Sequence, residues 1–268
     1  MPKFFVVSDV HGFYDEMKEA LGKAGFDPNN EEHWLISCGD NFDRGSQPVE
    51  VMRYLQDLPR KVLVKGNHES LLQDLCERGY PGNHDYSNGT YDTVCEFGGA
   101  GLGRSFDECC IITENRTKKF IYSMVSYFET KNYIFVHGWI PVTCKDNLPM
   151  YYRHNRKFEF NPDWRTAHHS EWEGARWLNG IDMARKGFVE PGKTIVCGHW
   201  HCSYGHYIQA LRDAVASGNS VFDVDVDEFG ETAIWEPYYG NGIIAIDRCT
   251  VHTGKVNVLV LEDEFLEE

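Results

Sequence analysis

The chain has 268 residues, of which 42% are hydrophobic and 14% aromatic, and this content excludes a wholly disordered protein. Lys and Arg number 26 against 41 Asp and Glu, and the formal charge of −15 argues against nucleic acid or an anionic membrane as a partner. The length fits one large α/β domain that spans residues 1–268.

The compartment is predicted from the N-terminus and the cysteines. Only four apolar residues, Phe4 to Val7, precede the polar pair Ser8 and Asp9, which is too short for a secretory leader. No run approaches the ~20 apolar residues of a membrane span. The nine cysteines are an odd number without a C-x-x-C motif, as is typical of reduced thiols. We therefore expect a cytoplasmic protein.

The first third of the chain alternates between two kinds of pattern. Short apolar runs at 4–8, 34–37 and 62–64 predict buried strands. Apolar residues at helical spacing over 13–24, helical spacing from Pro48 onward, and the segment 69–77 predict the intervening and following helices. This β-α-β-α-β-α order predicts a parallel sheet with right-handed crossovers.

The rest of the chain is less regular. The pattern weakens over about 80–130, and 141–190 is rich in Trp, Tyr, Arg and His; we expect both to be inserted or variable, the second partly helical. Further strands are predicted at 133–136 and 194–197, and two antiparallel strands at 243–246 and 256–261. A mixed α/β architecture with a second sheet is favoured over a single doubly wound sheet.

Each of five predicted strands ends in a polar cluster. The clusters are D-V-H-G (9–12), G-D-N-F-D-R-G (39–45), G-N-H-E (66–69), H-G (137–138) and G-H-W-H (198–201). Because the carboxyl ends of neighbouring parallel strands line one crevice, we expect the clusters to converge on one site.

Asp, Asn and His are ligands for Mn, Fe, Zn, Co or Ni. Two such ions ~3.5–4 Å apart, bridged by a carboxylate, would clamp a phosphate and activate a shared water. A lone D-x-H is weak support for such a site. The G-D-N-F-D-R-G and G-N-H-E motifs, in this order and each after a predicted strand, are much more specific.

On these motifs, together with C-G-H-W-H (197–201) and the closing G-I-I-A-I-D (242–247), the sequence resembles the metallophosphoesterase superfamily. Within it, the chain is similar to the phosphoprotein phosphatase (PPP) branch and its bacterial and phage serine/threonine phosphatases. The resemblance implies a calcineurin-like fold, which is a four-layer α/β/β/α sandwich with two mixed β-sheets flanked by helices.

The resemblance also implies two divalent metal ions, with manganese as the first choice. Asp40 would bridge them, and His201 would join the first metal as in superfamily members with a G-H-x-H block. The implied metal ligands are Asp9, His11, Asp40, Asn67, His137, His199 and His201.

Catalytic roles follow from the same motifs. The resemblance implies that His68 is the general acid and that Asp43 orients its ring. Arg44 would bind the phosphate oxygens, together with Asn67 and a second arginine. Arg176 is the expected second arginine and Arg165 the alternative, although packing on a neighbouring Trp would explain either residue equally well.

The implied function is a metal-dependent phosphomonoester hydrolase, specifically a serine/threonine protein phosphatase in which a metal-bridged hydroxide attacks phosphorus in line. Its partner would be a phosphoprotein or phosphopeptide, and no oligomeric state follows from the sequence. A symmetrical bis(5'-nucleosyl)-tetraphosphatase, acting on a nucleotide polyphosphate, shares the motifs and is the alternative. A non-enzymatic alternative is an inactive phosphatase-fold scaffold, although such proteins usually lack a ligand or the acid histidine.

Overall fold

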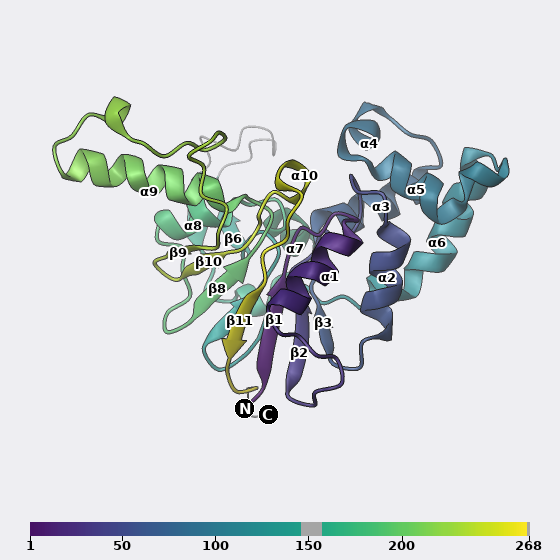
Figure 1. Ribbon diagram of the computed structural model, residues 1–268, viewed down its shortest axis with the longest axis horizontal. Helices are drawn as coiled ribbons and strands as arrows, with labels where there is room; N and C mark the ends of the chain where they lie inside the picture. The colour runs from purple at the N-terminus through teal and green to yellow at the C-terminus, as the bar shows by residue number, and fades with distance from the viewer. Residues whose placement is uncertain (146–156, 267–268) are drawn as a thin grey trace.

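The computed structural model describes residues 1–145 and 157–266. Two β-sheets stack at the centre of the molecule, and helices cover both outer faces (Figure 1). The two chain termini lie side by side at the end where β1 begins (Figure 1).

The first sheet has the strand order β11-β1-β2-β3. The three N-terminal strands run parallel, as the sequence predicts, while β11 runs antiparallel to β1. Amphipathic helices connect them, and Pro48 occupies the first turn of the second helix. The elements are β1 (Lys3–Val7), α1 (Tyr14–Lys23), β2 (His33–Ser37), α2 (Pro48–Asp57), β3 (Lys61–Leu63), α3 (Asn67–Arg78) and β11 (Leu259–Glu262).

The second sheet has the order β4-β5-β8-β10-β9, in which the central strands β5, β8 and β10 run parallel and the two edge strands antiparallel. Strands β6 and β7 pair antiparallel in a separate two-stranded sheet. These strands are β4 (Phe128–Glu129), β5 (Tyr133–Phe135), β6 (Val142–Cys144), β7 (Phe158–Phe160), β8 (Thr194–Cys197), β9 (Tyr238–Gly240) and β10 (Ile243–Ala245).

Three apolar cores separate four layers. One core lies between the sheets and includes Phe4, Val196 and Ile244. A second joins the first sheet to its helices, and a third joins the second sheet to α7 (His169–Ala175), α8 (Gly180–Arg185) and the start of α9 (Cys202–Ala216). The expected α/β/β/α sandwich is therefore confirmed.

The weakly patterned segment 80–130 is largely helical. It forms α4 (Asn83–Asn88), α5 (Thr90–Gly98) and α6 (Phe106–Tyr122). The helical pattern is hard to see in the sequence because Gly89 and Gly99, both with positive φ, divide the segment into short helices. The segment 141–190 is partly helical, as expected, and residues 146–156 of it lie outside the described ranges.

The last two predicted strands exist and each has an antiparallel partner, but they do not pair with each other. β10 pairs antiparallel with β9 and parallel with β8 in the second sheet, and β11 pairs antiparallel with β1 in the first. The short helix α10 (Thr250–Thr253) lies between them in the chain. Ile244 and Leu259 consequently meet in the core between the two sheets.

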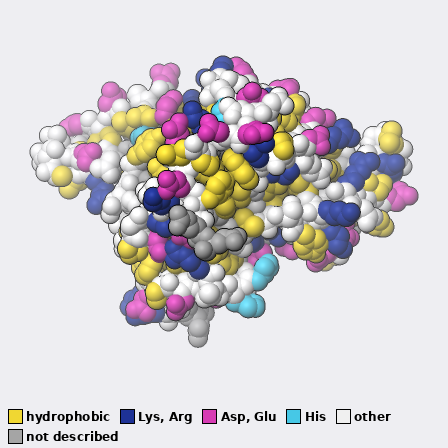
Figure 2. Space-filling model, turned by 90° about the horizontal axis from the view of Figure 1, so that it is seen from below, with side chains coloured by type: hydrophobic (Ala, Val, Ile, Leu, Met, Phe, Trp, Pro, Cys, Tyr) yellow, Lys and Arg dark blue, Asp and Glu magenta, His cyan; other side chains and the backbone are white. Residues whose placement is uncertain are grey.

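None of the helices in the described ranges is long and apolar enough to span a membrane. On the face shown in Figure 2, acidic and basic side chains are interspersed with apolar ones.

Candidate active site

The predicted polar clusters meet at the carboxyl ends of β1, β2, β3, β5 and β8. Among the described residues, two groups could each hold a metal ion, with ligand atoms within 4.8 Å of one another. One group consists of His11, Asp40 and His68; the other consists of Asp40, His137 and His199. Asp40 belongs to both groups, so its carboxylate lies where a bridging ligand would lie.

The ring orientation of two histidines suits metal binding. Nδ1 of His11 lies 2.9 Å from the carbonyl oxygen of Phe42, and Nδ1 of His137 lies 2.8 Å from that of Cys38. A carbonyl can only accept, so each Nδ1 carries the proton and donates it. Each Nε2 is thereby left for a ligand on the site side, the usual arrangement of metal-bound histidines.

Several acceptor atoms converge beside His137. Its Nε2 lies 2.8 Å from Oδ1 of Asn67 and 3.3 Å from Oδ2 of Asp40. Burial by itself would lower the pKa of His137, but attraction to Asp40 outweighs it and raises the pKa to about 9. A divalent cation would fit between these atoms, because an imidazole nitrogen, an amide oxygen and a carboxylate are all metal ligands.

The carboxylates of the site are buried at some electrostatic cost. Burial raises the pKa of Asp9 to about 6, although the charge of His137 opposes the shift. Burial would also raise the pKa of Asp40, but His137 and His68 hold it well below its usual range. Divalent cations would lower this cost, so the residues present fit the metal ions that the sequence predicts.

The backbone at the site is held in an unfavourable conformation. Left-handed φ angles are uncommon outside glycine, because Cβ approaches the carbonyl oxygen. Of the seven non-glycine residues with positive φ in the described ranges, six belong to the predicted site. These six are Asp9, His11, Asp40, Asp43, Arg44 and His199.

Glu69 holds the two central loops together. Its buried carboxylate accepts hydrogen bonds from the backbone N–H groups of Asp40, Asn41 and Gly66, at 3.1, 2.8 and 2.8 Å. A Cβ at Gly66 would lie 2.1 Å from Oδ1 of Asp40, so this position requires glycine. Sequence reasoning missed this role, although a Glu at the third position of a helix is a known capping signal.

The predicted acid pair is formed. Nδ1 of His68 lies 2.7 Å from Oδ2 of Asp43, and both residues are buried. Burial would lower the pKa of His68, but attraction to Asp40 and Asp43 outweighs it and raises the pKa. The hydroxyl of Thr90, at the start of α5, donates to the same Asp43 oxygen at 2.7 Å, a contact that the sequence did not reveal.

Arg44 lies at the mouth of the site. Its Nη1 lies 3.1 Å from Nε2 of His11, and its Nη2 lies 3.3 Å from Nε2 of His68. Arg44 is exposed, whereas both histidines are buried. An exposed guanidinium over two buried imidazoles can reach an incoming anion.

The two candidate second arginines lie in different surroundings. The guanidinium of Arg176 is buried, pairs with Glu173 and lies 3.4 Å from Oγ of Ser126. The carbonyl of Arg176 packs so close to Gly138 that a Cβ there would lie 2.5 Å from it. Arg165 instead binds Glu129 and Glu190 and stacks on Trp164.

His201 is placed apart from the two metal-capable groups. Its Nδ1 lies 3.0 Å from Oγ of Ser203, and its Nε2 lies 3.3 Å from Glu228. Its ring packs on Phe229, with centroids 4.6 Å apart.

The loop after β10 also reaches the site. The hydroxyl of Thr250 donates to the carbonyl of Asp9 at 2.8 Å, and Asp247 accepts from the backbone N–H of Cys249 at 2.6 Å. The sequence contained a signal for Asp247, because it follows an apolar strand as Asp9 and Asp40 do.

This fold and this site define a phosphoesterase of the calcineurin-like class. The chain belongs to the calcineurin-like phosphoesterase family, whose model matches residues 2–203.

Two relatives carry different names. Over 94 residues the chain is 40% identical to a serine/threonine-protein phosphatase 2 of Salmonella typhimurium, a match covering 34% of this chain and 41% of that protein. Over 66 residues it is 39% identical to a symmetrical bis(5'-nucleosyl)-tetraphosphatase of Serratia proteamaculans, covering 24% of this chain and 23% of that one. Both matches span less than half of the relative's length.

Among solved structures, a cold-active protein-tyrosine phosphatase of a psychrophilic Shewanella species is similar to 98% of this chain and 76% of its own. The TM-score is 0.51 at 20% sequence identity, which supports the shared fold.

Proposed function

We propose that this protein is a metal-dependent phosphomonoester hydrolase and that it acts on phosphoserine and phosphothreonine in proteins. The observation that supports this proposal most is the position of Asp40. Its carboxylate is shared by two metal-capable groups and lies 3.8 Å from Nε2 of His68, and the same nitrogen lies 3.3 Å from Nη2 of Arg44.

The metal ions would be held by side chains that follow strands of both sheets, all of them buried except the half-buried His199. When bound, two divalent cations, with manganese as our first choice, would neutralise the phosphate and activate a water for in-line attack. His201 is left out of this ligand set because its ring faces Ser203 and Glu228. The proposed ligands are Asp9, His11, Asp40, Asn67, His137 and His199.

The other side chains bind the phosphate and move a proton. The planar guanidinium of Arg44 would donate to two phosphate oxygens. His68 would donate its Nε2 proton to the leaving oxygen, while Asp43 holds the ring and favours the protonated form. Asn67 and Arg176 are the proposed further phosphate ligands, because Asn67 lies against His137 and the main chain of Arg176 packs on Gly138.

Two further proposals concern the whole chain. We propose that residues 1–268 form one phosphoesterase domain, since ligands from both sheets complete a single site. We also propose a cytoplasmic location, supported by buried thiols such as Cys38 and Cys197, whose pKa values burial raises. Such thiols suit a reducing compartment.

The test compares two aryl phosphates with leaving groups of different stability. His68→Asn should reduce kcat for phenyl phosphate by about 10²–10⁴, the usual contribution of general acid catalysis. The reduction should be smaller for p-nitrophenyl phosphate, because p-nitrophenolate leaves without a proton. His84→Asn, at an exposed histidine, is the control. Equal losses on both substrates would remove His68 from the acid role, and full activity after exhaustive chelation would contradict metal dependence.

The alternative substrate is a dinucleoside polyphosphate, and the name of the relative from Serratia supports this alternative. A competition assay between diadenosine tetraphosphate and a phosphothreonine peptide separates the two functions. We expect the peptide to be hydrolysed with the higher kcat/KM, and the reverse order would replace the proposed substrate class. A wild-type protein that hydrolyses no phosphate ester would instead indicate an inactive scaffold.

A further inference from the structure

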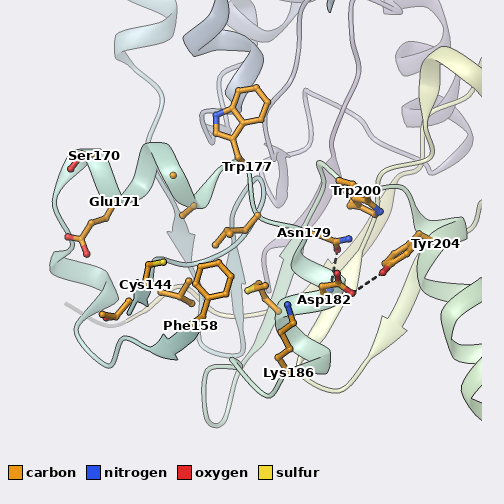
Figure 3. A pocket seen from close by; sticks show the side chains of 16 residues that line it. Cys144, Phe158, Ser170, Glu171, Trp177, Asn179, Asp182, Lys186, Trp200 and Tyr204 are labelled. Atoms are coloured by element: carbon orange, nitrogen blue, oxygen red, sulfur yellow. Dashed lines mark hydrogen bonds between the residues drawn. The ribbon is translucent and has the colours of Figure 1, made fainter. Parts of the chain in front are cut away.

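A cavity of about 920 Å³ adjoins the proposed site, and none of the roles assigned above uses it. Strands β6 and β7, helices α7 and α8 and the start of α9 surround it, and Trp177, Trp200 and Phe158 are among its lining residues (Figure 3). Its volume is at the upper end of the range for ligand pockets.

Two lining residues of the cavity, Trp177 and Trp200, contact the proposed metal ligand His199. The indole of Trp177 and the indole of Trp200 each lie edge-on to the ring of His199, with centroids 6.0 and 6.2 Å away. The cavity therefore lies next to the site, with these two indoles between it and His199. An extended peptide advances ~3.3 Å per residue, so a side chain within three residues of a phosphorylated residue can reach it.

The lining is mainly apolar. Its described charged residues are Glu171, Asp182 and Lys186, and Asp182 also pairs with Arg185 at 3.2 Å. One Asp182 oxygen accepts from the hydroxyl of Tyr204 at 3.0 Å (Figure 3). A polyphosphate would bring several negative charges against this wall, whereas a neutral or basic peptide would bring none.

One buried donor in the lining lacks an acceptor. The indole N–H of Trp200 has no hydrogen-bond partner in the part of the chain that the structure describes. A buried donor without an acceptor is unfavourable, but this N–H is itself shielded from the cavity and is not counted as a recognition group. The apolar side chains of the lining, Val142, Phe158, Leu178 and Met183, would pack against an apolar side chain of a bound peptide.

We propose that this cavity binds an apolar side chain of a phosphopeptide, within three residues of the phosphorylated residue. The inference rests on the proposed phosphatase function and adds a sequence preference to it. Leu and Phe fit the apolar lining.

A peptide scan tests the preference. The probes are phosphothreonine peptides with an Ala background, in which a single Leu occupies each position from three before to three after the phosphorylated residue. At one or more positions, Leu should raise kcat/KM about tenfold or more over the all-Ala peptide, as expected for an apolar group entering a pocket.

Filling the cavity should abolish the preference. Gly174 lines the cavity on helix α7, and a Cβ there meets no atom within 4 Å, so Gly174→Leu places a side chain in open space. Gly22 on helix α1 is equally open and lies outside the cavity lining, which makes Gly22→Leu the matched control. In Gly174→Leu the ratio of kcat/KM between the two peptides should fall to about one, while Gly22→Leu keeps it.

Because the ratio compares two substrates of one variant, changes at the metal site cancel. Should Gly174→Leu hydrolyse neither peptide, Ser170→Trp on the same helix takes its place. A scan without a preferred position, or a preference that survives both filling variants, overturns the inference and leaves the phosphatase function intact.

A wild-type enzyme that hydrolyses no phosphopeptide contradicts the proposed function itself, and the inference with it. A third result is that diadenosine tetraphosphate has a higher kcat/KM than every peptide and that Gly174→Leu abolishes this difference. This result would assign the cavity to a nucleoside and overturn the inference as well.

Discussion

At the scale of single residues, the proposed acid depends on a buried carboxylate with few partners. Oδ2 of Asp43 accepts from both His68 and Thr90, while Oδ1 has no partner in the described part of the chain. The hydroxyl of Thr90 is thus a main restraint on the carboxylate. Asp43 also has a φ of 71°, so the backbone alone does not favour this position. We infer that Thr90 is a positioning residue for His68.

Thr90→Val should therefore weaken proton donation without removing the acid. Thr90 is fully buried, and valine has nearly the same shape, so the main change is the loss of one hydrogen bond to a carboxylate, about 1.5 kcal/mol. We expect kcat for phenyl phosphate to fall about tenfold, kcat for p-nitrophenyl phosphate to fall less, and KM to change little. Steady-state kinetics on both substrates measure this difference.

The control for this variant is Thr117→Val, a buried threonine of α6 whose hydroxyl bonds within its own helix. If both variants lose the same activity on both esters, Thr90 has only a structural role.

At the scale of elements, the sequence predicts what local patterns determine. The strands β1, β2, β3, β5 and β8 were predictable because each is a short apolar run that ends in polar residues. The helices α4 and α5 were not, because glycines interrupt their pattern. Strand pairing was only partly predictable, since β10 and β11 belong to different sheets for reasons of packing between layers.

In the site, too, local patterns predict some residues and contacts between distant segments determine the others. The predicted ligands Asp40 and His137 carry their chemistry in the side chain, within a recognisable motif. Glu69, Thr90 and Thr250 act instead on backbone or side-chain atoms distant in sequence, and no local pattern reveals such contacts. The bond from Thr250 to Asp9, for example, spans 241 residues.

Arg165 ties together segments that are distant in sequence, namely its own, strand β4 and the loop before β8. Two of its nitrogens lie 2.6 and 2.9 Å from the carboxylate of Glu129 on β4, and a third lies 2.9 Å from Glu190. The side chain of Glu129 is only 9% exposed, and its remaining cation is Lys193 at 2.7 Å. These contacts favour a structural role for Arg165.

Arg165→Leu should destabilise the fold by about 1–2 kcal/mol, less than a fully buried pair, because Arg165 is partly exposed and Lys193 remains. Urea denaturation measures the change. The double variant Arg165→Leu/Glu129→Gln should recover part of the loss, since no carboxylate is left unpaired. Lys118→Leu, at an exposed pair with Glu114, is the control. A large loss of kcat with unchanged stability would instead support Arg165 as a phosphate ligand.

At the scale of the whole molecule, the site joins the two sheets. Asp9 and Asp40 follow strands of the first sheet, whereas His137 and His199 follow strands of the second. Oδ2 of Asp40 lies 3.3 Å from Nε2 of His137, across the boundary between the sheets. Metal ions bound here would connect the two halves of the sandwich and would bind the folded state alone.

Metal binding should therefore raise thermal stability as well as activity. A ligand that binds only the folded state at 100 times its Kd stabilises it by about 2.7 kcal/mol. For a chain of this size each kcal/mol shifts Tm by about 2–4 °C, so adding Mn²⁺ to chelator-treated protein should raise Tm by about 5–10 °C. Circular dichroism melts measure the shift without any substrate.

Asp40→Asn should lose most of this shift, because it removes the charge that both metal-capable groups share. Glu114→Gln, at an exposed carboxylate of α6, should keep the shift. An equal shift in wild type and Asp40→Asn would place the stabilising cation elsewhere, and no shift in either would contradict the joint role of the two sheets in metal binding.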